Sequence, residues 1–553
     1  MQSTEYRPPL YRHGCLSQAK SYANLVPLFF QDAPAPVSYA KVPALNNSQD
    51  LQSPAFIGRA ARSEPLAPLF VSTPEASLLH GDGGNTGSQD FPGPRGVDTQ
   101  VSAKAQRAFI FLWGKDNQLT SGYVNATGSA TRPAYGLVAL DPKSLDVLAA
   151  WYPEEKNQTL GFTYMEYIVG TNDVLVNSAE GYIWVVHRGS CRGWPYFKMV
   201  RTINLLPELQ KGERLLNSMF DTEGNIWFTT GAVLAGGASL ANTTTYGYIT
   251  PSNKVYKAQL DGEMVENGIA IAGTNMYMNT SPTGKNNKPD APGYMYSLTA
   301  KRGGKGSCGI ETRWRVPYDA GAKTEIDPNM VTSRGSGSTP ALLADKYVAM
   351  TDNDSPRVHL NVYHQEPQAN GSKQQLVCQV PLFAANTGSV LNSVLGHYDS
   401  KRNKHAIMIL NSYGGPPLYS GENGQDINGK LNDMSGMAGG VARVDVDQHG
   451  NCSVRWSDEL HSKAVSVLST KSGLVYQYTQ DIQRAAKGEY VWYLAGRDWV
   501  TGEIIFQVRT GAGGAFNDNW TGGALGPDGT FYQSISGGVV AIKDAPQDSC
   551  KAH

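Results

Sequence analysis

The chain has 553 residues, with 47 Lys and Arg against 48 Asp and Glu, so its formal net charge is −1. Only 17% of the residues are charged and no long basic run occurs, which argues against a nucleic-acid partner. No stretch reaches the roughly 18 apolar residues of a membrane-spanning helix, so we expect no membrane insertion. Sixty Gly and 28 Tyr favour many short strands and turns, and therefore an all-β fold.

The first 65 residues show little periodicity. They contain Pro8, Pro9, Pro34 and Pro36, and no apolar core typical of a signal peptide. We expect residues 1–65 to wrap around the outside of one domain formed by residues 66–553. A disordered tail is the alternative.

A repeated unit organises the rest of the chain. The stretch YGLVALDPKSLDVLAAW (135–151) reads as two strands joined by an Asp-Pro turn, and YVWYLAGRDWVTGEIIFQV (490–508) has the same order of parts. Between them, strand-like runs recur in groups of four, roughly every 50 to 70 residues. This period is typical of a β-propeller, in which each four-stranded blade packs on its neighbours. We predict a single propeller of eight blades, with seven as the alternative.

The blades follow one another in chain order. Blade one would have AFIFLWG (108–114) as its second strand and the 135–151 hairpin as its third and fourth. Later blades start with TYMEYIVG (163–170), LLNSMFD (215–221), NGIAIAG (267–273), TPALLAD (339–345), NSVLGHYD (392–399) and AVSVLST (464–470). The last unit (522–544) supplies three strands. We expect its missing outer strand to come from APLFVST (67–73), which would close the ring.

Cysteines and sequons suggest the compartment. Six Cys occur without a C-x-x-C pair, which fits disulfides better than zinc, and Cys15 and Cys550 could bridge the two chain ends. Nine Asn-x-Ser/Thr sequons lie at Asn46, Asn125, Asn157, Asn242, Asn279, Asn353, Asn370, Asn451 and Asn519. We expect a glycosylated protein that is secreted or resides in the lumen of the secretory pathway.

The spacings ALDPKSLDVLAAW (139–151) and GRDWVTGEIIFQV resemble the repeat of quinoprotein (PQQ) alcohol and glucose dehydrogenase propellers. The match covers two or three blades well. Methanol-oxidising members of that family use a vicinal Cys-Cys pair, and this chain has none. The resemblance therefore supports the fold more than a quinone-dependent oxidation.

In length, sequons and blade pattern the chain is also similar to secreted fungal propeller proteins of secondary-metabolite pathways. These include the hetero-Diels-Alderases that build tropolonic sesquiterpenes. The resemblance implies an apolar small-molecule substrate, dehydration to a quinone methide, and cycloaddition with a terpene, without a cofactor.

Propeller ligands bind where the inner strands begin and where the loops between second and third strands converge, and polar residues at these places are the candidates. As catalytic acids we predict Glu166, Glu266 and His461. As substrate-binding residues we predict Tyr164, Asn217, Asn267, Asp352, Asp354, Asn392, Tyr413 and Trp520. Singly, each residue could instead bond only to backbone or water.

Other functions remain open. Clustered Asp, Asn and Glu could hold Ca²⁺ in a PQQ-like or metal-dependent oxidoreductase or lactonase. The run HGDGGNTG (80–87) could also bind a cation, although a turn-rich connection is the simpler reading, and we predict no metal site. A noncatalytic propeller that binds glycans through exposed Trp and Tyr is a third hypothesis. The sequence does not decide the oligomeric state.

Overall fold

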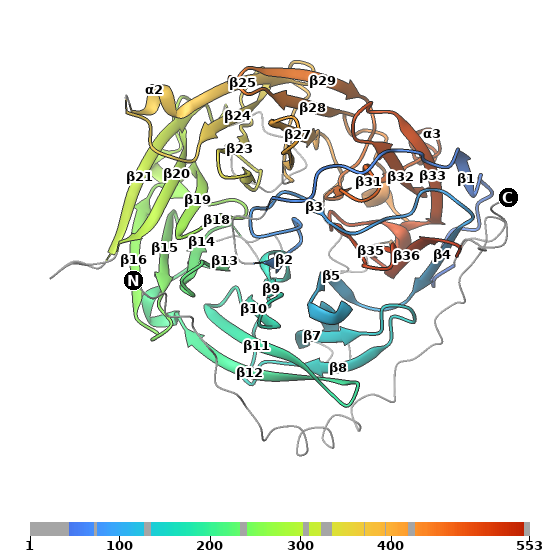
Figure 1. The fold of residues 1–553 in the computed structure, drawn as a ribbon, viewed down its shortest axis with the longest axis horizontal. Coiled ribbons are helices and arrows are strands. Elements are labelled where there is room, and N and C mark those ends of the chain that lie inside the picture. Colours follow the sequence, from blue (N-terminus) through green and yellow to red (C-terminus); the bar gives the residue numbers. More distant parts are fainter. Residues whose placement is uncertain are drawn as a thin grey trace.

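The computed structural model describes residues 44–70, 75–125, 134–232, 241–301, 309–321, 335–369, 371–392, 394–417 and 426–546. These residues form eight antiparallel four-stranded blades around a ring (Figure 1). The protein is an eight-bladed β-propeller, which confirms the predicted all-β fold. Among the described residues, no helix is long and apolar enough to cross a membrane.

Blades one to four follow the order expected from the repeat, each running from the channel outwards. Their strands are β5 (Ala108–Trp113), β6 (Leu119–Asn125), β7 (Ala134–Leu140) and β8 (Val147–Trp151); β9 (Glu166–Ile168), β10 (Asp173–Asn177), β11 (Tyr182–Cys191) and β12 (Trp194–Asn204); β13 (Leu215–Phe220), β14 (Ile226–Thr230), β15 (Thr243–Ile249) and β16 (Val255–Asp261); and β17 (Glu263–Met264) with β18 (Ala270–Ala272), β19 (Asn275–Pro282), β20 (Gly293–Lys301) and β21 (Gly309–Tyr318).

Blades five to eight repeat the same arrangement. Their strands are β22 (Ala341–Leu343), β23 (Tyr347–Thr351), β24 (Val358–His364) and β25 (Leu376–Leu382); β26 (Leu395–Asp399), β27 (Lys404–Leu410), β28 (Val441–Val446) and β29 (Cys452–Asp458); β30 (Val467–Ser469), β31 (Leu474–Gln480), β32 (Val491–Asp498) and β33 (Ile504–Ala512); and β34 (Gly523–Leu525), β35 (Phe531–Ile535) and β36 (Gly538–Asp544). Helices are short: α2 (Ser372–Gln375), α3 (Ile482–Ala485), and the 3-10 turns η1 (Lys115–Asn117), η2 (Phe162–Tyr164), η3 (Leu206–Glu208), η4 (Gly284–Asn286), η5 (Lys430–Asn432) and η6 (Gly514–Phe516).

The ring closes through an N-terminal strand, but not through the predicted one. Strand β4 (Thr99–Lys104) pairs antiparallel with β36 and completes blade eight. It buries Val101 and Ala103, as a strand on a packed sheet must. Residues 67–70 of the predicted segment 67–73 form no strand, and residues 71–73 lie outside the described residues. Pro68 within this segment cannot donate to a ladder, which explains the error.

Blade one also differs from its prediction in strand order. The run AFIFLWG is β5, the innermost strand, and not the second. The second strand, β6, has the sequence LTSGYVN, in which polar and small residues hide the alternation that marks a strand. The predicted third and fourth strands are β7 and β8, as expected.

The described part of the N-terminal segment lies on blade seven. Strand β1 (Phe56–Gly58) pairs with β33 at the outer edge of that blade, and Arg59 donates from its backbone to the Ile505 carbonyl. This pairing covers a sheet edge that would otherwise be open. The proposed domain boundary at residue 65 stays a prediction.

Residues 75–90, which we call the channel segment, cross the centre of the ring, where Figure 1 shows β2 (Ala76–Ser77) and β3 (Ser88–Gln89). Strand β2 pairs with β9 of blade two, and β3 pairs in parallel with β30 of blade seven. Between them, the carbonyls of Gly83, Gly84 and Thr86 accept backbone hydrogen bonds from the inner strands of blades four, five and six. The channel segment therefore ties together five inner strands.

Glycine permits this close approach. Gly81 has a φ of +88°, and a Cβ atom there would lie 2.8 Å from the Ser88 carbonyl oxygen. A Cβ on Gly84 would lie 3.3 Å from the Leu342 side chain. The glycine-rich run 80–87 is thus explained by the crowded channel, since only glycine adopts such a φ without strain.

Candidate active site

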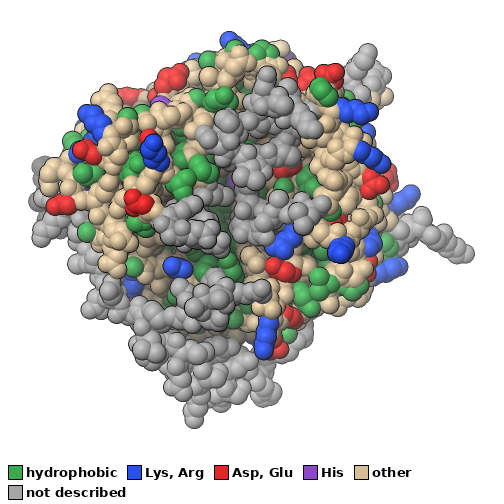
Figure 2. All heavy atoms as spheres, turned by 180° about the vertical axis from the view of Figure 1, so that it is seen from behind, with side chains coloured by type: hydrophobic (Ala, Val, Ile, Leu, Met, Phe, Trp, Pro, Cys, Tyr) green, Lys and Arg blue, Asp and Glu red, His purple; other side chains and the backbone are tan. Residues whose placement is uncertain are grey.

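A cavity of about 280 Å³ opens near the ring centre. It lies on the face that Figure 2 shows, which is the far side in Figure 1, and the surface is hollowed there. It lies where the inner strands begin. The channel segment supplies its floor through Leu79 and His80, and blades one, two and four to eight contribute to its walls. The volume is close to the lower end, about 300 Å³, of pockets that bind small molecules.

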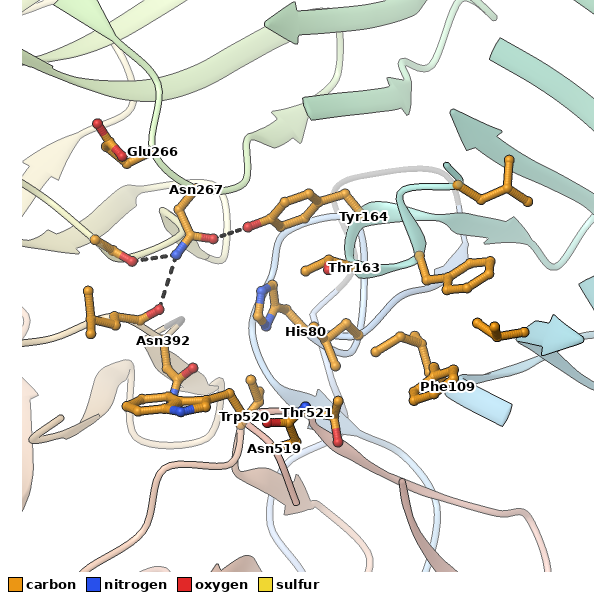
Figure 3. Close-up of a pocket in the computed structure, with 18 of the residues that line it drawn as sticks. His80, Phe109, Thr163, Tyr164, Glu266, Asn267, Asn392, Asn519, Trp520 and Thr521 are labelled. Carbon is orange, nitrogen blue, oxygen red and sulfur yellow. Dashed lines mark hydrogen bonds between the residues drawn. The ribbon is translucent and has the colours of Figure 1, made fainter. Parts of the chain in front are cut away.

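One side of the cavity is polar, as Figure 3 shows. The amide of Asn267 lies at its centre and accepts hydrogen bonds from the hydroxyls of Tyr164 and of Thr339, the latter at 2.7 Å. Its amino group donates to the carbonyls of Gly337 and Leu391, the latter at 3.2 Å. With donors and acceptors all engaged, this amide is held in one orientation and fixes the Tyr164 ring.

Burial decides the protonation of two groups here. It lowers the pKa of His80 to about 3, so the imidazole is neutral at ordinary pH. Its Nε2 lies 3.4 Å from the Thr339 hydroxyl, whereas its Nδ1 has no hydrogen-bond partner among the described residues. Burial also raises the pKa of the Tyr164 phenol, which keeps its proton.

A carboxyl group and a second amide border the same side. Glu266 follows strand β17 and is 4% exposed, and it lines the cavity beside Asn267. Asn392, just before β26, donates to the backbone carbonyl of Lys463 at 2.8 Å. A carboxyl, an imidazole and a fixed amide therefore line the same cavity.

The opposite side is apolar. Phe109 and Phe162 stack with ring centroids 6.4 Å apart, and Tyr135 packs on Phe162 at 5.9 Å. A Cβ on Gly122 would lie 2.5 Å from the Phe162 ring, so this glycine makes room for it. Ile110, at a φ of +61°, sits in a bulge of β5, and strained backbone of this kind is frequent at ligand sites.

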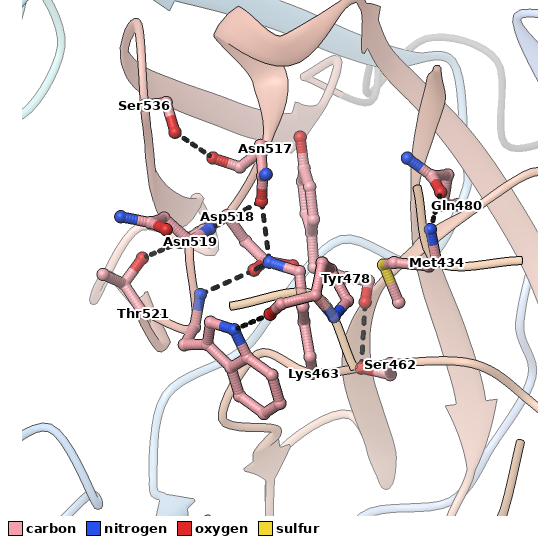
Figure 4. Close-up of polar contacts among 12 residues, drawn as sticks. Met434, Ser462, Lys463, Tyr478, Gln480, Asn517, Asp518, Asn519, Thr521 and Ser536 are labelled. Atoms are coloured by element: carbon pink, nitrogen blue, oxygen red, sulfur yellow. Dashed lines mark hydrogen bonds and ion pairs between the residues drawn. The ribbon is translucent and has the colours of Figure 1, made fainter. Parts of the chain in front are cut away.

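Trp520 forms a further wall, supported by the network in Figure 4. It has a φ of +66°, a conformation that bulky residues rarely adopt. Its backbone N–H donates to Asp518 at 2.8 Å and its indole donates to the Pro416 carbonyl at 2.9 Å. Asp518 in turn forms an ion pair with Lys463, whose ammonium also donates to Asn517 at 2.7 Å.

The structure brings five of the predicted site residues together. The cavity is lined by Tyr164, Glu266, Asn267, Asn392 and Trp520. Asn217 lies one layer behind, since its side chain donates to the Asn267 carbonyl at 3.0 Å.

Two of the predicted acids lie elsewhere. Glu166 is buried between blades two and three, where its carboxylate accepts the Phe220 N–H at 2.9 Å. Burial raises the pKa of this carboxyl to about 8, yet Glu166 does not line the cavity. His461 is half-buried before β30, and it does not line the cavity either.

Three predicted binding residues serve local structure. Asp352 accepts the backbone N–H of His359 at 2.7 Å and lies 3.3 Å from its imidazole, while Asp354 lies 3.9 Å from the same ring. Tyr413 is half-buried and its N–H donates to Asn411 at 3.1 Å. None of these three side chains lines the cavity.

Sequence reasoning missed several residues of the cavity, among them His80, Phe109, Phe162 and Thr163. Phe162 and Thr163 directly precede Tyr164, so the rule that ligands meet the starts of inner strands could have found them. His80 could not be placed, because nothing in the run 80–87 indicates that it crosses the channel.

This run is not built as a cation site. Its carbonyls at Gly83, Gly84 and Thr86 accept backbone hydrogen bonds, and Asp82 accepts the Thr86 N–H at 2.9 Å. Within the described ranges, no cluster of three or more His, Cys, Asp or Glu could hold a metal ion.

The structure also separates the sequons. Asn279 and Asn353 are 1% and 7% exposed, and their side chains donate to the carbonyls of Ser338 and Gly335. A glycan on either would require the blade to open, so we withdraw these two sites. Asn46, Asn157, Asn242 and Asn451 are exposed, Asn125 and Asn519 are half-buried, and Asn370 lies outside the described residues.

Among the described cysteines, Cys378 of β25 and Cys452 of β29 form a disulfide, which links blades five and six. The predicted pair of Cys15 and Cys550 lies outside the described residues.

Comparisons with known proteins add little to this description. No protein-family model matches the chain. An uncharacterized protein of Archaeoglobus fulgidus is 25% identical over 359 residues, which are 62% of this chain and 63% of that protein. The chain thus spans less than two thirds of that relative's length.

Similar solved structures include Chaetomium thermophilum Sqt1, with a TM-score of 0.45 and 9% identity over 81% of this chain and 97% of that one. A streptogramin B lyase has a TM-score of 0.36 and 10% identity over 80% of this chain and 97% of the other. The WD40 domain of SCAP from fission yeast has a TM-score of 0.42 and 10% identity, over 80% of this chain and 92% of the other. Likenesses this distant carry no argument about activity, and the propeller fold rests on the strand pairing itself.

Proposed function

We propose that this protein is an enzyme that binds an apolar small molecule in the central cavity and catalyses its cyclisation through proton transfer, without a cofactor. The observation that carries the proposal is the arrangement of the cavity. Aromatic and aliphatic side chains cover one side, and Glu266, His80 and the fixed amide of Asn267 lie on the other. Such a pocket binds the apolar body of a ligand and orients its polar end.

The specific reaction that we propose is dehydration to an ortho-quinone methide, followed by a hetero-Diels-Alder addition. In the first step, Glu266 in its protonated form gives its proton to the hydroxyl of a benzylic alcohol. The C–O bond breaks, water leaves, and the carboxylate then takes the proton of the neighbouring ring hydroxyl. One carboxyl group therefore acts as acid and as base, and it ends in its starting form.

The second step needs no proton transfer. The quinone methide carbonyl oxygen and its exocyclic carbon form two σ bonds to the two carbons of an alkene. With its proton on Nδ1, the nitrogen that has no partner among the described residues, neutral His80 can donate one N–H hydrogen bond to the carbonyl oxygen, which makes the quinone methide more electrophilic. The apolar walls hold the reactants in contact, which lowers the barrier through proximity.

A minimal assay tests this proposal with known compounds. Purified protein is incubated with 2-hydroxybenzyl alcohol and the sesquiterpene caryophyllene, and the adduct is quantified by liquid chromatography and mass spectrometry. We expect adduct formation above the protein-free rate, and a loss of about 10²-fold or more in Glu266→Gln. The matched control Glu154→Gln, at an exposed position, should retain the full rate. Equal rates and product ratios with and without protein would refute the proposal.

We also propose that the protein is secreted or resides in the secretory pathway. The Cys378–Cys452 disulfide and the exposed sequons support this proposal, because disulfides and N-glycans form in that compartment.

A further inference from the structure

A second cavity, of about 540 Å³, lies between blades six and seven on the face opposite the central pocket. We call it the inter-blade groove. Four of its side chains lie in one row across the four strands of blade six and therefore on one face of the sheet. From β26 to β29, the directly opposed residues of this row are His397, Ala406, Asp445 and Ser453. Trp499, in the turn after β32, lines it from blade seven.

The carboxylates of the groove are already engaged. Asp399 forms an ion pair with Arg402 at 2.7 Å, and Asp445 pairs with Arg443 at 2.8 Å. Asp447 accepts backbone and side-chain N–H groups of the turn that follows it, at 2.8 to 3.0 Å. Asp399 and Asp445 are therefore balanced by their own cations, whereas Asp447 keeps its negative charge and is satisfied by the turn.

Of the four cations that line the groove, Arg402 and Arg443 have these ion pairs, whereas Lys404 of β27 and Arg455 of β29 have none among the described residues. Burial lowers the pKa of Arg443, Asp445 acts in the opposite direction, and repulsion from the nearby Arg455 guanidinium lowers this pKa further. An anion between them would relieve this repulsion.

A buried imidazole completes the site. His397 is 4% exposed, and neither ring nitrogen has a hydrogen-bond partner among the described residues. Burial first, and Arg443 in addition, lower its pKa to about 4, while Asp399 and Asp90 act in the opposite direction. The ring is therefore neutral and has an N–H to donate, and a buried donor of this kind calls for a partner.

We propose that the inter-blade groove binds an oxyanion, the phosphate or sulfate group of a small polar molecule. Guanidinium forks match the oxygen spacing of such groups, and Arg443, Arg455, Lys404 and the His397 N–H supply donors around one volume. The volume of the groove is larger than that of a phosphate ion, so it leaves room for the rest of a phosphate ester. This site is separate from the central pocket and does not depend on the function proposed for it.

Isothermal titration calorimetry of the full chain tests this inference with sodium phosphate, sodium sulfate and glucose 6-phosphate, each against sodium chloride at equal ionic strength. We expect saturable heat with at least one oxyanion and none with chloride. Tighter binding of glucose 6-phosphate than of phosphate would identify an ester as the ligand, and equal binding would identify the free anion.

Variants locate the site. Arg455→Gln and Lys404→Gln should each weaken binding about tenfold, because a charge-assisted hydrogen bond is lost. Both side chains are exposed, so the fold should persist. Arg357→Gln and Lys211→Gln, exposed positions on other blades, should leave binding unchanged. As a second readout, the imidazole signals of His397 should shift in NMR spectra when the anion is added. Absence of specific heat with all three anions, or binding by the Lys404 and Arg455 variants that is as tight as that of the wild type, would overturn the inference.

Discussion

Lys463 and Asp518 form an ion pair beneath Trp520, with only 1% and 0% of their side chains exposed. The pair acts on the pocket from two sides. Asp518 accepts the Trp520 N–H, and the Lys463 carbonyl accepts the Asn392 amide. Because Trp520 has a strained backbone, this network determines the position of the pocket wall.

Removing one charge of this pair should be costly. Lys463→Met leaves the Asp518 carboxylate buried without its cation, and we expect a loss of about 3–5 kcal/mol in the free energy of unfolding. Urea unfolding followed by fluorescence measures it. The double variant Lys463→Met/Asp518→Asn should recover part of the loss, and Lys487→Met, at an exposed position, should lose less than about 0.5 kcal/mol. A single variant as stable as the wild type would contradict this account of the pair.

Glu166 should make stability fall as pH rises. Its pKa is about 8 in the folded protein, against a usual value of 4.5, because burial penalises the carboxylate. Between about pH 5 and pH 8 the native state therefore holds a proton that the unfolded state has lost, so the free energy of unfolding decreases with pH. The slope can reach about 1.4 kcal/mol per pH unit.

The variant Glu166→Gln isolates this effect, because it keeps the shape of the protonated acid. It should be more stable than the wild type at pH 8, and the difference should shrink towards pH 5. Urea unfolding at several pH values checks this, with Glu154→Gln as the exposed control. A difference that does not depend on pH would show that Glu166 is not buried as described.

The channel segment should matter for the whole ring. The Asn85 side chain donates to the carbonyls of Ile269 and Pro340, at 2.7 and 3.1 Å, and so joins blades four and five. Asn85→Ala leaves both buried carbonyls without this donor, and we expect a loss of about 2–4 kcal/mol in unfolding free energy. Asn403→Ala is the matched control, since Asn403 also has a positive φ but is exposed. Equal losses in the two variants would mean that the channel hydrogen bonds contribute nothing.

Glycan occupancy should follow exposure. In protein from a eukaryotic host, glycopeptide mass spectrometry should find glycans at some of Asn46, Asn157, Asn242 and Asn451, and none at Asn279 or Asn353. The buried pair uses its amide groups as donors to backbone carbonyls. A glycan on Asn279 in folded protein would contradict the burial of that strand.

The repeat made the fold predictable, because each blade carries the same local signals of strand, turn and strand. Closure was harder. Strand β4 (TQVSAK) has only two separated apolar residues, whereas the segment 67–73 contains the apolar run LFV, and only the pairing with β36 identifies β4 as the closing strand. The path of the channel segment could not be predicted from local sequence either, because its hydrogen-bond partners lie on five different blades.

The site was predictable to the extent that topology determines it. Tyr164, Glu266, Asn267 and Asn392 all lie where inner strands begin, and the structure brings them together. Glu166 comes only two residues after Tyr164, but Tyr164 ends the 3-10 turn η2 whereas Glu166 begins strand β9, and its carboxyl group accepts the Phe220 N–H of blade three. His80 depends on the path of the channel segment, which no local pattern encodes.

The most direct test of the central claim is affinity selection of an apolar metabolite extract, followed by mass spectrometry. It uses the wild type, the cavity-filling variant Thr163→Trp, and Thr171→Trp, an exposed position of the same blade. We predict that the wild type and Thr171→Trp retain the same apolar compound and that Thr163→Trp does not. Retention by all three proteins, or by none, would contradict the claim that this cavity binds the substrate.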